Sequence, residues 1–141
     1  MHVAEERTES AGVREKERST MWKTHKVLIV EDEPRLRKCF SKEFREEGLS
    51  VIEASDGEEA LEILYGSEKI ALVILDILLP EKSALDIYDQ IRKEFPHVNI
   101  VISSNYSVDE QKFLFQDADG FYNKGDSIKE LVDQTSRLLG V

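Results

Sequence analysis

The chain has 141 residues and a formal net charge of -10, with 19 Lys and Arg against 29 Asp and Glu. This length fits one domain, and a hydrophobic content of 40% is enough for its core. The acidic balance argues against direct nucleic-acid binding. No apolar stretch has the length of a membrane span, so we expect no membrane partner and a cytoplasmic location.

Residues 1–25 differ in composition from the rest of the chain. They are rich in Glu, Arg, Lys, Ser and Thr and hold few large apolar side chains. Such a segment buries too little surface to order itself. We therefore expect a charged, flexible extension over residues 1–25, with a short docked helix as the alternative, and one domain over residues 26–141.

From Lys26 onward, short apolar runs alternate with helical patterns about every dozen residues. This rhythm is typical of a parallel sheet with helices on both faces. The runs rich in Val, Ile and aromatic residues predict five strands, at Lys26–Val30, Ser50–Ala54, Ile70–Leu75, Asn99–Ser103 and Gly120–Asn123.

The first predicted helix has clear start and stop signals. Pro34 can open it, and Gly48 can close it in a left-handed cap. Phe40 and Phe44 recur at i+4 spacing and give it an apolar face. Cys39, the lone cysteine, lies among these positions and is predicted to be a buried structural thiol in a reducing compartment.

Two later helices also have capping signals. Asp56 can cap a helix over Glu58–Tyr65, with Glu59 as its capping-box partner, and Asp126 or Ser127 can cap the last helix. These polar residues are therefore assigned to structure.

Polar side chains come at the ends of four predicted strands. Glu31 and Asp32 follow the first strand, Asp76 the third and Lys124 the fifth, while Ser104 follows the fourth. In an α/β sheet, ligands bind beyond the carboxyl ends of the strands, so these side chains can converge. Crowded carboxylates repel one another unless a cation lies among them, which favours Mg²⁺.

Asp76 is the strongest candidate for a nucleophile, because it ends the most apolar strand. The residues after it, Ile77 to Pro80, remain apolar instead of starting a helix, which argues against a simple capping role. Lys124 is suited to salt bridging and phosphate contact. A nucleophile, a metal and a charge stabiliser together are what handling of a phosphoryl group requires.

Two stretches, Val27–Pro34 and Leu75–Pro80, resemble the signature stretches of bacterial response-regulator receiver domains, which include chemotaxis-type single-domain receivers. The resemblance covers residues 26–141. It implies a flavodoxin-like (βα)5 fold, a doubly wound parallel five-stranded sheet of order 2-1-3-4-5. It also implies phosphoryl transfer from a sensor histidine kinase or a histidine phosphotransfer protein to Asp76, which would switch the binding of a downstream effector.

The same resemblance implies a ligand set for Mg²⁺. Asp32, Asp76 and the backbone carbonyl of Leu78 would hold the ion, with Glu31 reaching it directly or through water. Lys124 would pair with one phosphoryl oxygen.

The resemblance further implies a switch. Ser104 would hydrogen-bond a second phosphoryl oxygen and move inward after phosphorylation. Phe121, three residues before Lys124, takes the place of the family's switch aromatic, and simple packing in the core is an equal alternative for it. Tyr122 is expected to point to the opposite face of the sheet.

The chain departs from the family pattern at several positions. Glu81-Lys82-Ser83-Ala84 replaces Gly-x-Asp-Gly, with Ser83 as the expected helix cap, and Asn105 is bulkier than the usual residue. Gly125 replaces a frequent proline. The fourth helix, expected over Val108–Gln116, is short for the family, which alters a face on which many receivers dimerise, so we expect a monomer or a phosphorylation-dependent dimer.

Three alternatives remain open. A phosphatase of the haloacid-dehalogenase type needs an aspartate two residues after the nucleophile, but position 78 is leucine. A receiver-like interaction domain that works without phosphorylation is supported by Asn105 and Gly125 alone. A third alternative is that the chain was cut from a longer regulator. The expected role is a phosphorylation-controlled binding module that takes part in its own phosphorylation and dephosphorylation, not a turnover enzyme.

Overall fold

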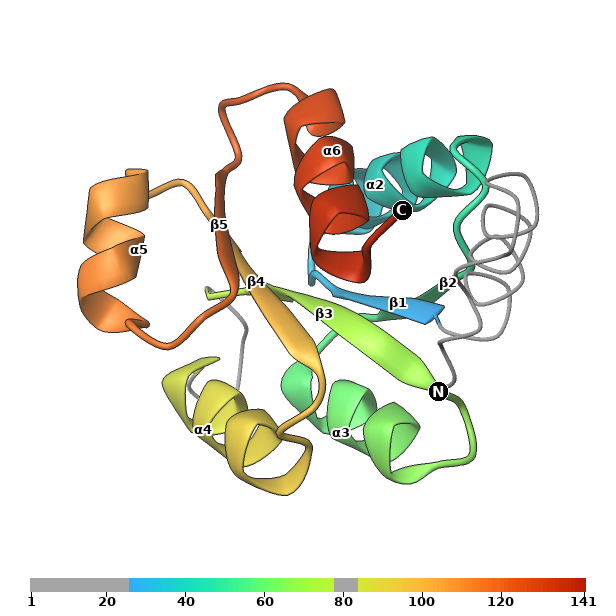
Figure 1. The fold of residues 1–141 in the computed structure, drawn as a ribbon, viewed down its shortest axis with the longest axis vertical. Helices are drawn as coiled ribbons and strands as arrows, with labels where there is room; N and C mark the ends of the chain where they lie inside the picture. Colours follow the sequence, from blue (N-terminus) through green and yellow to red (C-terminus); the bar gives the residue numbers. More distant parts are fainter. Residues whose placement is uncertain (1–25, 78–83) are drawn as a thin grey trace, which may run out of the picture.

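The computed structural model describes residues 26–77 and 84–141. Its centre is a parallel five-stranded sheet of order β2-β1-β3-β4-β5 (Figure 1). The strands are β1 (Lys26–Val30), β2 (Val51–Ala54), β3 (Ile70–Asp76), β4 (Asn99–Ser104) and β5 (Gly120–Asn123). The helices of the described residues are α2 (Pro34–Glu46), α3 (Gly57–Tyr65), α4 (Ala84–Glu94), α5 (Val108–Leu114) and α6 (Ile128–Leu139). The fold class and strand order are those predicted.

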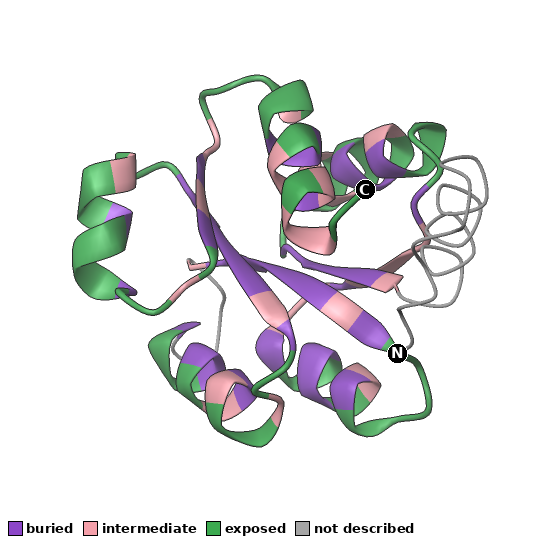
Figure 2. Ribbon diagram, in the orientation of Figure 1, coloured by how far each residue is buried: buried purple, intermediate pink, exposed green. Residues whose placement is uncertain are grey.

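Helices cover both faces of the sheet. Figure 1 shows α2 and α6 on one face, α3 and α4 on the other, and α5 beside β5 at the edge. Because successive side chains of a strand point to opposite faces, β1 supplies both cores. Val27 and Ile29 pack with Phe40 and Phe44 of α2, whereas Leu28 and Val30 pack on the opposite side. Figure 2 shows the resulting burial along the strands.

The predicted strand boundaries agree with the structure to within one residue. The first and fifth strands match, and the second begins one residue later. The third and fourth each extend by one residue, because Asp76 pairs with Ser103 and Ser104 pairs with Asn123 in the parallel ladders. The two polar candidates therefore belong to the strands, whose ladders fix their backbones.

The predicted helix caps are largely confirmed. Pro34 opens α2, and Gly48 beyond its end has φ +89°, the left-handed conformation that glycine tolerates. Asp56 Oδ1 accepts from Glu59 N at 2.8 Å, while the Glu59 carboxylate accepts from Ser55 N, not from Asp56 N. The reciprocal half of the capping box is thus shifted by one residue.

The other predicted ends have mixed outcomes. Ser127 is the residue that caps α6, accepting from Glu130 N. The helix expected over Val108–Gln116 ends at Leu114, and the buried Phe115 follows it. Ser83 lies outside the described residues. No helix in the described part of the chain is long and apolar enough to cross a membrane.

The prediction for Cys39 is wrong. The side chain is exposed. Phe40 and Phe44 define the inward stripe of α2, and one residue along a helix turns the side chain by about 100° around the axis. Cys39 therefore faces away from the core although its neighbour in sequence is buried.

Replacing Phe44 with alanine should destabilise the protein by about 3–5 kcal/mol, because the fully buried ring leaves a cavity between α2 and the sheet. Urea denaturation measures the free energy of unfolding. Cys39→Ala on the exposed side of the same helix is the matched control and should change it by less than about 0.5 kcal/mol. Equal effects of the two substitutions would contradict this packing of α2 on the sheet.

Candidate functional site

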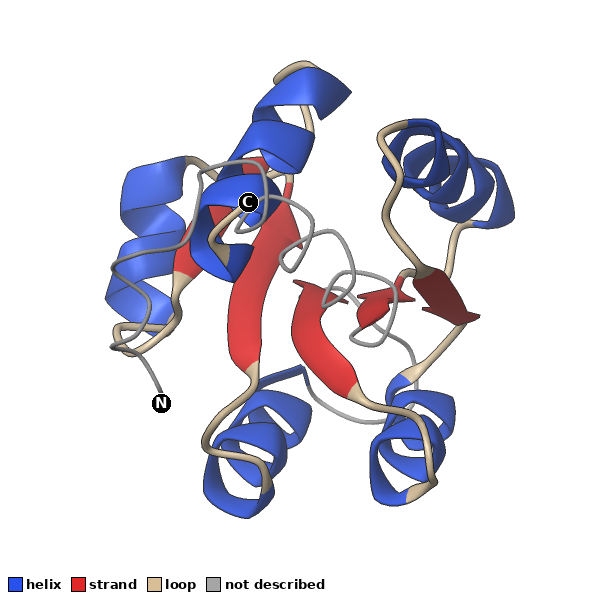
Figure 3. Ribbon diagram, turned by 45° about the vertical axis from the view of Figure 1, so that its right-hand side comes forward, coloured by secondary structure: helices blue, strands red, loops and turns tan. Residues whose placement is uncertain are grey.

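Figure 3 shows the sheet between its layers of helices. Because the sheet is parallel, the carboxyl ends of β1, β3, β4 and β5 lie at the same edge. Glu31 follows β1, Asp76 ends β3, Ser104 ends β4, and Lys124 follows β5. A backbone hydrogen bond from Lys124 N to Ser104 O, at 2.8 Å, fixes the lysine beside the end of β4. The strand arrangement therefore brings together side chains that are far apart in sequence.

Lys124 connects two buried carboxylates. Its Nζ lies 2.9 Å from Glu31 Oε1 and 3.1 Å from Asp76 Oδ1. The side chains of Glu31 and Asp76 are each 2% exposed and that of Lys124 is 10% exposed. The two buried acids therefore share one ammonium group as their common counter-charge.

The pKa values of Glu31 and Lys124 follow from burial and from their contacts. Burial raises the pKa of Glu31, and the charge of Asp76 adds to this effect, while the hydrogen bond from Lys124 opposes it. Burial by itself would lower the pKa of Lys124, but the hydrogen bond to Glu31 and the charge of Asp76 raise it overall. The lysine is therefore held as an ammonium ion between the two acids.

Three carboxylates form a candidate metal site. Glu31, Asp32 and Asp76 each offer an oxygen, and these oxygens lie within 4.8 Å of one another. Asp32 is exposed, whereas the other two are buried. An all-oxygen donor set with excess negative charge suits a hard divalent cation such as Mg²⁺. The residues present therefore fit the predicted ion.

The Glu31 carboxylate is held at both oxygens. Oε1 pairs with Lys124, and Oε2 accepts from Glu33 N at 3.2 Å. Its orientation is thus fixed by the protein before any ion binds. Asp32 is exposed and is therefore the more accessible donor for direct coordination, whereas Asp76 is as deeply buried as Glu31.

Ser104 is buried, and its hydroxyl oxygen accepts from Tyr106 N at 2.8 Å. The carbonyl of Tyr106 in turn accepts from Gln111 Nε2 at 3.0 Å and Asn123 Nδ2 at 2.8 Å. Gln111 Nε2 also donates to Tyr122 O at 3.0 Å. The candidate switch hydroxyl is therefore connected to α5 and β5 through one loop.

The remaining predicted residues have different outcomes. Phe121 is half-buried and packs against the core on the side of α3 and α4. Tyr122 is buried on the opposite face, as expected, where its ring packs edge-on to Phe40 with centroids 6.0 Å apart. The Leu78 carbonyl lies outside the described residues.

Sequence reasoning missed two residues that support the site. Arg37 Nη1 donates to the backbone carbonyl of Glu31 at 2.8 Å. Gln111 is fully buried in α5, whereas the neighbouring Phe113 is 78% exposed. The sequence carries a weak signal for Arg37, a polar residue in the first turns of a helix that follows the acids. For Gln111 it carries none, because hydrophobicity alone predicts that the phenylalanine is inside.

Comparisons with known proteins agree on one family. The family model of the response regulator receiver domain matches residues 27–136. The probable transcriptional regulatory protein TcrX of Mycobacterium tuberculosis is 31% identical over 80% of this chain, and the transcriptional activator PfeR of Pseudomonas aeruginosa is 33% identical over 81% of it. The chain spans 49% and 37% of the lengths of these two relatives.

A solved structure agrees with this result. The response regulator TrrA of Thermotoga maritima, in complex with Mg²⁺-BeF, is 33% identical and superposes with a TM-score of 0.72. The match covers 81% of this chain and 98% of that one. With the family's fold and an acidic pocket that fits a phosphoacceptor aspartate, the chain belongs to the response regulator receiver domains of two-component systems.

Proposed function

We propose that this chain accepts a phosphoryl group on Asp76 from the phosphohistidine of a sensor histidine kinase or of a histidine phosphotransfer protein. The observation that carries this proposal is the buried Asp76 carboxylate, whose Oδ1 lies 3.1 Å from the ammonium of Lys124. A carboxylate nucleophile beside a fixed positive charge meets the main requirements of phosphoryl transfer.

In the proposed reaction, an oxygen of Asp76 attacks the phosphorus in line with its bond to the histidine nitrogen. The O–P bond forms as the N–P bond breaks, and the imidazole keeps the electron pair and takes up a proton. Negative charge spreads over the phosphoryl oxygens beside Lys124. Because Glu31 already holds the ammonium in place, at 2.9 Å, little reorganisation is needed as this charge develops.

Asp32, Asp76 and the backbone carbonyl of Leu78 would hold Mg²⁺, which would neutralise charge on the phosphoryl group. Glu31 would reach the ion directly or through water.

A phosphoryl group on Asp76 would also act as a switch. Ser104 would turn its hydroxyl from Tyr106 N toward a phosphoryl oxygen, so the hydrogen bond at 2.8 Å would be lost. The Tyr106 carbonyl is tied to Gln111 of α5 and to Asn123 of β5, so movement of this loop would reach both elements. Phe121 would then repack inward.

The proposal extends to the organisation and partners of the chain. Residues 26–141 would form the receiver domain, with residues 1–25 outside it. The domain would act as a switched binding module in the cytoplasm, not as a turnover enzyme. Its partners would be a kinase or phosphotransfer protein and a downstream effector, without direct contact with nucleic acid or membrane, and it would be a monomer or a phosphorylation-dependent dimer.

Incubation with Mg²⁺ and either acetyl phosphate or a phosphorylated kinase domain should add one phosphoryl group, about 80 Da, detectable by intact-mass analysis. Asp76→Asn should abolish the gain, because an amide is a poor nucleophile. Asp133→Asn, which changes an exposed acid of α6, should leave it intact. No gain from either donor, with Mg²⁺ saturating and the wild-type protein folded, would contradict the proposal and favour an interaction domain that works without phosphorylation.

Lys124→Gln should slow this mass gain by about 10²–10³-fold, because the variant lacks the fixed charge beside the phosphoryl oxygens. The time course of modification at saturating Mg²⁺ measures the effect. Lys129→Gln removes an exposed lysine from α6 and serves as the control. Equal rates for the two variants would show that Lys124 does not stabilise the transferring group.

The raised pKa of Glu31 predicts a pH dependence of stability in the metal-free protein. The folded state binds this proton more tightly than the unfolded state, so wild-type stability falls as pH rises from the ordinary value of 4.5 through the raised pKa. Glu31→Gln cannot lose a proton and should escape this fall.

Urea denaturation of both proteins with a chelator, at pH values from about 4 to 8, tests this sign. The stability of Glu31→Gln relative to wild type should increase across the window and then level off. A constant difference, or one that decreases with pH, would contradict the effect assigned to burial and Asp76.

A further inference from the structure

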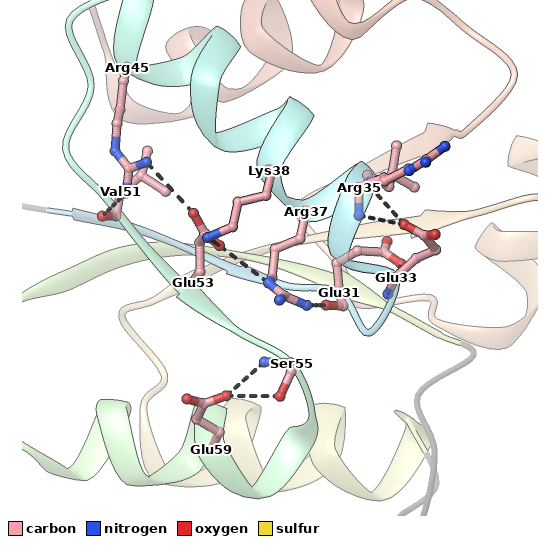
Figure 4. Close-up of polar contacts among 11 residues, drawn as sticks. Glu31, Glu33, Arg35, Arg37, Lys38, Arg45, Val51, Glu53, Ser55 and Glu59 are labelled. Atoms are coloured by element: carbon pink, nitrogen blue, oxygen red, sulfur yellow. Dashed lines mark hydrogen bonds and ion pairs between the residues drawn. The ribbon is translucent and has the colours of Figure 1, made fainter.

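Arg37 of α2 connects two neighbouring strands, β1 and β2. Its Nη1 donates to the backbone carbonyl of Glu31 at 2.8 Å, and its Nε donates to Glu53 Oε1 of β2 at 3.2 Å (Figure 4). One planar guanidinium thus joins the residue that follows β1 to the middle of β2. A lysine has a single nitrogen and cannot make this pair of contacts with the same geometry.

Glu53 holds Arg37 in place. The two side chains are 16% and 15% exposed, so their charges are largely removed from water and depend on each other. Lys38 and Arg45 also approach the Glu53 carboxylate, at 3.3 and 3.6 Å, from the same helix (Figure 4). Burial would raise the pKa of Glu53, but hydrogen bonds from Ser41, Lys38 and Arg37 lower it overall.

The carbonyl that Arg37 holds belongs to the peptide group between Glu31 and Asp32. Because a peptide group is planar, holding this oxygen also fixes the orientation of the peptide plane that contains the Cα atom of Asp32. The preceding amide is fixed as well, since Glu31 N donates to Ala54 O at 3.0 Å. Asp32 is exposed, and its carboxylate has to meet those of Glu31 and Asp76 for the three to share an ion.

We propose that Arg37 is a positioning residue for the metal site. Clamped by Glu53, it orients the peptide between Glu31 and Asp32 so that the carboxylates on either side of that peptide converge with Asp76. The identity of the ion, Mg²⁺, rests on the function proposed above, whereas the orienting role of Arg37 does not.

Arg37 could act through its charge or through its orientation of the peptide, and the two roles predict opposite effects of its removal on Mg²⁺ binding. A guanidinium near a divalent cation repels it, so a role through charge alone means that removing Arg37 strengthens Mg²⁺ binding. A positioning role means that removing it weakens binding, because the acids lose their mutual orientation. Arg37→Lys separates the two further, since it keeps the charge but not the two-pronged contact.

Isothermal titration of the full chain with MgCl₂ measures the affinity. We expect Arg37→Gln and Arg37→Lys each to weaken Mg²⁺ binding by about 10-fold, the effect typical of lost partners behind metal ligands. Lys38→Gln and Arg45→Gln are the matched controls, because they remove a charge from the same Glu53 without touching the Glu31 carbonyl. Both should stay within about twofold of wild type or bind slightly more tightly.

Unchanged or tighter binding by Arg37→Gln would overturn the proposal, as would equal losses in Arg37→Gln and the two controls. Thermal unfolding confirms that each variant is folded. Glu53→Gln tests the same contact from its other side. It removes the charge that holds Arg37 and should weaken Mg²⁺ binding without altering Arg37 itself.

Amide hydrogen exchange of Glu33, measured by NMR on the metal-free protein, gives a readout that does not depend on the ion. Its N–H donates to Glu31 Oε2 at 3.2 Å, so loss of orientation should speed its exchange in Arg37→Gln but not in Arg45→Gln. If wild type binds no Mg²⁺, the proposed metal fails, and the exchange rate still decides the role of Arg37. Equal exchange in wild type and Arg37→Gln would overturn that role.

Discussion

The ammonium of Lys124, held between Glu31 and Asp76, is the interaction on which the site depends. Both carboxyl groups are almost fully buried, and burial together with the charge of Asp76 makes ionisation of Glu31 costly. The shared cation offsets that cost and is itself kept charged by the two acids. The arrangement places the Asp76 carboxyl group beside a fixed positive charge, as a phosphoryl acceptor requires.

The scaffold fixes this arrangement from two sides. The strand order puts β1 beside β3, so Glu31 and Asp76 are neighbours, while β4 separates β3 from β5. Lys124 therefore reaches over the end of β4, where its amide is bonded to Ser104 O. On the other side, Arg37 of α2 holds the peptide after β1. In the proposed switch, phosphorylation moves the Ser104 side and leaves the Arg37 side in place, so that the metal ligands keep their positions while the loop changes.

Much of this site could be predicted from sequence because strand ends are easy to find. Four strand ends were found as apolar runs that stop at a polar residue. Because the strands are parallel, their carboxyl ends lie at one edge of the sheet, so the polar residues there come together. The prediction for Cys39 failed, and the inward side of α5 was not predicted at all, because both depend on the direction of single side chains on a helix. Cys39 is exposed although Phe40 beside it is buried, and α5 turns Gln111 inward and Phe113 outward. The hydrogen-bond partners in the loop and in β5 decide the orientation of α5, and single-sequence periodicity over seven residues does not reveal them. The reach of Arg37 to a carbonyl in another element is likewise a tertiary property.

The most direct measurement is to locate the phosphoryl group at residue level. Borohydride reduces an aspartyl phosphate to homoserine, so treatment of the phosphorylated protein followed by peptide mass spectrometry identifies the modified carboxylate. We predict homoserine at position 76 alone, formed in wild type and absent without Mg²⁺. Reduction at Glu31, Asp32 or any other acid in place of Asp76, or at none in a protein that has gained phosphate, would contradict the assignment of Asp76 as the acceptor.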